Sequence, residues 1–423
     1  MSAGNAQRAR TAGGRLPFGV HLLAFCLFAM GSAEFLLAGV LPAVADDLRI
    51  TLSSAGALIS AFAAGVVLGG PPLAVLTLHW PRRTTLVTTQ AVFAASVAAG
   101  LLTDSYVLLL ATRFVSGLAY AGFWAVAAVT AISLVTPDRT ARASGVVVSG
   151  LSLAMIAGGP AGALLSHFTG WRGGFWGVVA LTLAGAVMTL LVLPATGAGG
   201  EAREAREARE ARVASELRTM RRPQLWVVYA VVILTTAAYM ISFNYLAAFL
   251  TGVTGVPAVW VPPILTLFGV GAFAGLSAGG RIADRLPFHA LLIGAIGILA
   301  GSVLLALLAP YALAVVPLVL LLGVAGFVLN PALYGRVFSI AAEAPTLAGA
   351  TTVSAFQFGI SLVPALAGLA LDAGAGVTSV AWIGAGLAAA AVPAILLDRA
   401  LASRRSPAPG TGRSVAPAGE HAA

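Results

Sequence analysis

The chain has 423 residues, of which 59% are hydrophobic and 9% are charged, and its formal charge is +9 at pH 7. Because soluble domains carry about 25% charged residues, this composition excludes a soluble globular protein and indicates a polytopic membrane protein. Every basic side chain apart from histidine is an arginine, and most lie between apolar runs. We therefore expect the positive charge to orient loops at the lipid bilayer and not to bind nucleic acid.

Apolar runs of about 20 residues, the length that crosses a bilayer as a helix, recur along nearly the whole chain. They predict an all-α polytopic membrane protein of about twelve transmembrane helices. The first six runs lie near 18–43, 53–76, 85–102, 106–135, 143–166 and 173–194, and the second six near 225–250, 257–279, 288–309, 311–340, 346–371 and 377–397.

The arginines are divided unequally between the two sides of these predicted helices. Only Arg49 and Arg172 fall in loops assigned to the outside, and Arg113 lies within a helix. The remaining 21 lie in the N-terminal segment, in the alternate loops or the helix ends beside them, and in the C-terminal tail. Since basic loops are retained in the cytoplasm, both termini are predicted to be cytoplasmic and the protein to lie in the cell membrane.

A charged segment separates the predicted helices into two groups of six. It contains four tandem Glu-Ala-Arg triplets, a composition that favours helix. The predicted parts are a cytoplasmic N-terminal segment (1–17), an N-terminal six-helix bundle (18–194), a cytoplasmic helical linker (195–224), a C-terminal six-helix bundle (225–398) and a disordered cytoplasmic tail (399–423).

Two ionisable side chains, Glu34 and Arg113, lie in the middle of long apolar runs. A charge at this depth costs roughly 2.5 to 3.5 kcal/mol, so such residues are functional-site candidates by default. A buried arginine needs a partner, and Glu34 is the obvious acid. We expect Glu34 to bind a proton near neutral pH and Arg113 to control that proton. Alternatively, Arg113 holds helices together and Glu34 is a structural acid.

The two halves resemble each other in short segments. Ser32-Ala-Glu34-Phe-Leu in the first helix matches Ser242-Phe-Asn244-Tyr-Leu in the seventh, and Ala121-Gly-Phe in the fourth matches Ala325-Gly-Phe in the tenth. Together these matches favour two parallel repeats related by an axis along the membrane normal, with a central site at their interface.

These features resemble the major facilitator superfamily, and the resemblance covers the whole membrane part. Its loop motif Gly-x-x-x-Asp-Arg-x-Gly-Arg-Arg is similar to Gly280, Asp284 and Arg285 after the eighth helix. After the second helix, only Arg82 and Arg83 remain, which leaves that copy degenerate. The resemblance implies that these residues form a latch at the cytoplasmic helix ends.

Two further motifs indicate a branch of the family. Arg113-Phe-Val-Ser-Gly resembles its Arg-x-x-x-Gly signature, and Gly159, Pro160 and Gly162 resemble the Gly-Pro signature of antiporters. Segments around Glu34, Trp80 and Trp171 look most like actinobacterial chloramphenicol exporters in the drug:proton antiporter branch. The resemblance implies proton-driven export of a small drug by alternating access, as a monomer and without a cofactor.

Neutral polar and aromatic side chains are concentrated in the second half. Asn244, which corresponds to Glu34, cannot titrate but can bind a polar ligand. We expect a mostly apolar substrate site with few polar groups. Its candidate residues are Asn244, Tyr245, Tyr239, Asn330, Tyr334, Gln357, Phe358 and, from the first half, Tyr120. This distribution suggests that the halves divide proton handling and substrate binding between them.

Other functions fit the sequence less well. Sugar or metabolite efflux would call for more hydrogen-bonding side chains along the cavity, and a membrane sensor that no longer transports stays an alternative. A channel should show a charged ring or filter loop, and neither is apparent. The five histidines show no metal-ligand spacing, so we expect no metal site and no enzyme activity.

Overall fold

The computed structural model describes residues 16–76, 80–136, 139–194, 219 and 221–403. Most of the predicted linker and the end of the predicted tail lie outside the described residues. Twelve helices in the described part are long and apolar enough to cross a membrane, which confirms the predicted all-α membrane fold. Their bounds agree with the apolar runs of the sequence to within a few residues.

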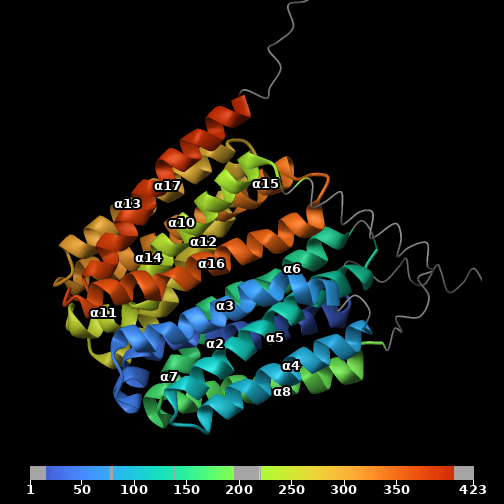
Figure 1. Cartoon of the computed structure of the whole chain (residues 1–423), viewed down its shortest axis with the longest axis horizontal. Coiled ribbons are helices and arrows are strands. Elements are labelled where there is room, and N and C mark those ends of the chain that lie inside the picture. The colour runs from blue at the N-terminus through green and yellow to red at the C-terminus, as the bar shows by residue number, and fades with distance from the viewer. Residues whose placement is uncertain (1–15, 77–79, 137–138, 195–218, 220, 404–423) are drawn as a thin grey trace, which may run out of the picture.

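The chain builds two groups of helices, which occupy the lower and upper parts of Figure 1. The first group comprises α2 (Phe18–Leu48), α3 (Leu52–Leu76), α4 (Arg82–Leu101), α5 (Tyr106–Ser133), α6 (Thr140–Leu153), the π-helix η3 (Ala154–Gly158), α7 (Gly159–Thr169) and α8 (Trp171–Val192). The second comprises α10 (Pro223–Asn244), α11 (Leu246–Gly252), the 3₁₀-helix η4 (Ala258–Trp260), α12 (Val261–Ala283), α13 (Pro287–Leu307), α14 (Ala312–Val328), α15 (Asn330–Ile340), α16 (Pro345–Asp372) and α17 (Ser379–Ser403).

Two membrane spans change helix geometry in their interior, and the chain breaks again directly after a third span. A π-helical turn connects α6 to α7 directly before Pro160, whose ring cannot donate a backbone hydrogen bond. The break between α14 and α15 precedes Pro331 in the same way. The third break separates α10 from α11 at Tyr245. These interruptions are tolerated because the surrounding helices bury the freed backbone groups.

The same close helix contact occurs in both halves. A Cβ atom at Gly117 of α5 would collide with the carbonyl of Phe62 in α3, and one at Gly323 of α14 would collide with the carbonyl of Phe268 in α12. Small residues let helix backbones approach closely where the solvent is lipid and hydrophobic burial no longer drives association. The glycines therefore hold α3 on α5 and α12 on α14.

We call the end of the molecule where α2 begins and α17 ends the proximal end, and the opposite end the distal end. Near the proximal end, the buried Asp398 carboxylate accepts bonds from Arg336 Nε at 2.9 Å, from Arg336 Nη2 at 2.8 Å and from Gln224 Nε2 at 2.9 Å. Such a bidentate pair is strong, and it joins α10, α15 and α17. No motif in the sequence indicated this cluster.

A second charged cluster stabilises the distal end of the first half. Asp47 at the end of α2 accepts bonds from Trp171 Nε1 at 2.9 Å and from Arg172. Arg172 also pairs with Asp104 at 2.7 Å. The arginine therefore joins α8 to the end of α2 and to the loop between α4 and α5, at an exposed site where each ion pair contributes little.

Replacing Asp398 by Ala should lower the free energy of unfolding by about 3 to 5 kcal/mol, because it leaves the Arg336 charge buried without a partner. The measurement is thermal unfolding of the purified protein in detergent. Asp104→Ala is the control: its carboxylate is 95% exposed, so its loss should cost less than about 1 kcal/mol. Equal losses in the two variants would contradict this account of the cluster.

Candidate substrate and proton site

Glu34 lies midway along α2, one of the helices of the first group that pack against helices of both groups. Along its length, α2 contacts α3, α5, α6, η3, α7 and α8 of its own group and α10, α11 and α12 of the other. Phe35, its neighbour, lies 6.1 Å from Phe243 of α10, centroid to centroid. The position of α2 therefore places a carboxyl group at the interface between the two groups.

Arg113 of α5 is the charged partner of Glu34, with which it interacts electrostatically. It is 6% exposed, and its guanidinium carbon lies 5.0 Å from the ring centre of Phe62 and 5.8 Å from that of Phe175. The faces of these rings attract a cation. Within the described part of the chain, Arg113 Nε and Nη1 have no hydrogen-bond partner. The two aromatic rings were not expected from the sequence.

Glu34 is also approached from the second group. The side chain of Gln357, on α16, lies beside the Glu34 carboxyl, and its Oε1 atom has no hydrogen-bond partner among the described residues. Tyr120 of α5 and Tyr239 of α10 lie close enough to interact electrostatically with the carboxyl. Glu34 is thus surrounded by one cation, one amide and two phenols drawn from both groups.

A polar and aromatic cluster extends from this point into the second group. The Tyr239 hydroxyl lies beside Thr236 and Asn330, and its ring lies 5.3 Å from Phe327. Asn330 Oδ1 and Thr236 Oγ1 are buried without hydrogen-bond partners in the described structure. Tyr334, one turn further along α15 than Asn330, packs 5.5 Å from Phe356. Buried polar atoms with spare bonding capacity beside aromatic rings can bind a small polar aromatic molecule.

The structure does not bring all the predicted substrate residues together. Tyr245 lies about 9 Å further than Tyr239 along the direction of the α10 helix axis. There its hydroxyl faces Gly56 of α3, so it contributes to the contact between the two groups nearer the distal end. Phe358 is 44% exposed, because the residue after Gln357 turns about 100° around the helix. Asn244 is buried with an unpartnered Nδ2 atom, but it ends α10, whereas Glu34 lies inside an unbroken helix.

The Gly-Pro motif packs α7 against α2. A Cβ atom at Gly159 would lie 2.8 Å from Phe35 Cβ, and one at Gly162 would lie 2.9 Å from a methyl group of Leu36. Pro160 is buried in the first turn of α7. On the other side, Gly269 of α12 touches the backbone of Ile156 in η3. The motif therefore lies where α2, the π-helical turn and the second group meet.

The loop-motif residues lie at the proximal end. Arg82 and Arg83 begin α4 and are half-buried. Asp284 and Arg285 follow the end of α12 and are exposed, and neither makes an ion pair with another described residue. Gly280 has open space around it. In this conformation the predicted latch is not formed between described residues, so its role stays a prediction.

The arrangement can exchange a proton and bind a ligand. Glu34 can be neutralised either by Arg113 or by a proton, whereas Asp398, also buried, is fully bonded to Arg336 and Gln224. No group of three or more His, Cys, Asp or Glu side chains in the described ranges could hold a metal ion.

Comparison with known proteins places this site in a family of transporters. Residues 23–364 match the Major Facilitator Superfamily. The chain is 37% identical to a chloramphenicol resistance protein of Streptomyces lividans, over 94% of this chain and 100% of that protein. It is 30% identical to the inner membrane transport protein YdhP of Escherichia coli strain K12, over 89% and 94% of the two chains.

Solved structures agree on the fold. A bacterial homolog of the human lysosomal transporter Spinster, in an inward-facing and unoccupied conformation, superposes with a TM-score of 0.70. The sequences are 19% identical, and the match covers 93% of this chain and 100% of the other. The relatives are transporters, which confirms the expectation of a multi-pass membrane transporter that is not an enzyme.

Gly159→Ala should impair both stability and transport, because the added methyl group has no room against α2. Overpacking of this kind costs about 1 to 3 kcal/mol. Thermal unfolding and the rate of drug efflux from cells would measure the effect. Gly145→Ala in α6 is the matched control, since nothing lies within 4 Å of the position of its Cβ. If the two variants behaved alike, the contact would not constrain the helices.

Proposed function

Since the chain belongs to the major facilitator superfamily, we propose that it exports a small neutral drug in exchange for protons, with chloramphenicol or a related amphenicol as substrate. The observation that carries the proposal is the position of Glu34. It is a carboxyl group at the interface of the two groups, balanced by one arginine and touched by side chains of the opposite group.

Proton coupling requires a group whose charge changes during transport. A protonated Glu34 is neutral and no longer attracts Arg113, whereas an ionised Glu34 pairs with it. Because Gln357 reaches the carboxyl from α16, a change of charge alters a contact between the two groups. This arrangement supports a mechanism in which proton binding and substrate binding favour different orientations of the groups.

The substrate class follows from the chemistry of the second group and from the relatives. Tyr239, Asn330 and Gln357 offer hydroxyl and amide groups, while the aromatic rings nearby offer stacking surfaces. Chloramphenicol is neutral and aromatic and carries hydroxyl and amide groups, which match these side chains. A 37% identical relative over nearly the whole chain is a chloramphenicol resistance protein.

A growth-inhibition panel in a host that lacks its own exporters tests the substrate class. Expression of the protein should raise the tolerated concentration of chloramphenicol and leave the tolerated concentrations of cationic dyes and toxic sugar analogues unchanged. The reason is that Glu34, the acid of the described site, already interacts with the Arg113 charge. Protection against sugar analogues alone would support the sugar-efflux alternative and contradict the proposal.

Glu34→Gln should abolish active efflux without reducing the amount of protein in the membrane, because the amide keeps the shape of the side chain but cannot exchange a proton. The measurement is chloramphenicol efflux from energised cells. Glu343→Gln is the matched control, since that carboxylate is 69% exposed and should be dispensable. Retained efflux against a gradient in Glu34→Gln would rule out this residue as the proton carrier.

Arg113→Ala should move the pH dependence of transport toward higher pH, since removing the guanidinium favours the protonated form of Glu34. Arg113→Lys keeps the charge and should move it less. The pH profile of substrate-induced proton release would be recorded for each purified variant. An unmoved midpoint in a well-folded Arg113→Ala protein would show that the arginine only holds helices together.

A further inference from the structure

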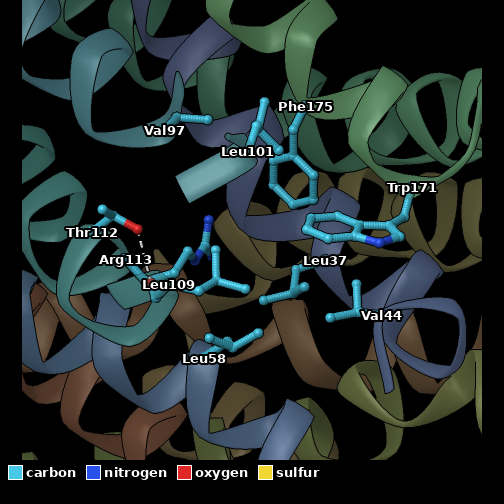
Figure 2. Close-up of a pocket in the computed structure, with 10 residues that line it drawn as sticks. All are labelled: Leu37, Val44, Leu58, Val97, Leu101, Leu109, Thr112, Arg113, Trp171 and Phe175. Carbon is cyan, nitrogen blue, oxygen red and sulfur yellow. Dashed lines mark hydrogen bonds between the residues drawn. The ribbon is translucent and has the colours of Figure 1, made fainter. Parts of the chain in front are cut away.

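A small cavity lies within the first group, on the side of Arg113 that faces α4 and α8. Its volume is about 20 Å³, enough for one water molecule, which needs roughly 10 to 15 Å³ by this measure. Figure 2 shows the side chains around it. They are Leu37 and Val44 of α2, Leu58 of α3, Val97 and Leu101 of α4, Leu109, Thr112 and Arg113 of α5, and Trp171 and Phe175 of α8.

The guanidinium of Arg113 points into the middle of these side chains (Figure 2). Its Nε and Nη1 atoms are buried and have no hydrogen-bond partner in the described structure. The other lining groups offer it little: the Thr112 hydroxyl donates to the carbonyl of Leu109 at 2.9 Å, and the indole N–H of Trp171 donates to Asp47. The polar wall of the cavity is therefore the one that Arg113 forms. Leaving the buried N–H groups of a cation unpaired is costly.

We propose that the cavity is a water site, in which a bound water molecule accepts hydrogen bonds from Arg113 and thereby competes with Glu34 for the guanidinium. Buried waters typically bond to polar groups that the protein leaves unsatisfied. When Glu34 is protonated, the water and the rings of Phe62 and Phe175 would solvate Arg113. The part of this proposal that concerns proton coupling rests on the proposed function, whereas the hydration of the cavity does not.

The charges around the pair are few. Tyr120 of α5 and Tyr239 of α10 interact with Glu34, and Gln357 of α16 is neutral. Beyond Trp171, Asp47 and Arg172 pair with each other at the distal end. The residues that α3 and α4 contribute to the cavity are apolar. The water would therefore be a principal influence on how strongly Arg113 binds Glu34.

Val97→Ile adds one methyl group to the cavity, and Val92→Ile is the matched control because Val92 lies on the same helix and is 42% exposed. Hydroxyl-radical footprinting of the full chain in nanodiscs, with radicals made by a short X-ray pulse, detects water held beside buried side chains. Phe175 should be labelled in the wild type and in Val92→Ile, and protected in Val97→Ile. Phe93 and Phe123, which are fully buried and do not line the cavity, should stay unlabelled in all three.

The same variants give a second readout. With the water expelled, Arg113 interacts more strongly with ionised Glu34, so protons should be released at lower pH. The midpoint of substrate-induced proton release should fall by about 0.5 pH unit in Val97→Ile, which is the effect of one hydrogen bond of ordinary strength. Labelling of Phe175 no stronger than that of Phe93 would overturn the water site. A higher Tm in Val97→Ile would also overturn it, because filling a dry cavity stabilises a protein. Loss of labelling with an unmoved midpoint would refute the competition with Glu34.

Discussion

The structure depends on the cost of placing a charge in an apolar medium. A carboxylate or guanidinium at the depth of Glu34 and Arg113 is expensive unless it is paired. The protein meets this cost by opposing one acid to one base, and it surrounds the base with aromatic rings from α3 and α8. The acid is on a helix that contacts the other group, and Gln357 of that group lies beside it.

The contrast with Asp398 clarifies what makes Glu34 suitable for exchange. Asp398 accepts three bonds within one group, and removing Arg336 would leave its buried carboxylate without a compensating charge. Glu34 has looser partners and one that belongs to the opposite group. A strongly bonded carboxylate fixes a structure, whereas a weakly bonded one can lose or gain a proton at moderate cost.

The helices around Glu34 pack through small residues. Gly159 and Gly162 bring α7 onto α2, and Gly269 brings α12 onto the π-helical turn. Contacts made by glycines leave few interlocking side chains to separate when one helix slides on another. The contact of Gly269 with Ile156 lies between the two groups and suits an interface at which they change orientation. The contacts of Gly159 and Gly162 hold α7 on α2 within the first group, which explains why Gly159→Ala would be harmful.

Much of this arrangement could be predicted from the sequence. Hydropathy located the twelve helices, and the isolation of Glu34 and Arg113 in apolar runs identified the pair. The breaks at Tyr245 and Leu329 were missed, because both lie inside continuous apolar runs. Phe62 and Phe175 were missed because an aromatic residue in an apolar helix gives no signal of its partner. The expected division of labour between the halves is less clear than the sequence suggests, since Gln357 of the second half lies beside Glu34.

Direct titration of the purified protein tests the central claim, that Glu34 exchanges its proton for substrate. Chloramphenicol would be added to the detergent-solubilised protein in unbuffered solution, and the protons released would be counted over a range of pH. The account predicts release of up to one proton per drug bound in the wild type, and binding without release when residue 34 cannot titrate. Drug binding with no proton release from the wild type at any pH would contradict it.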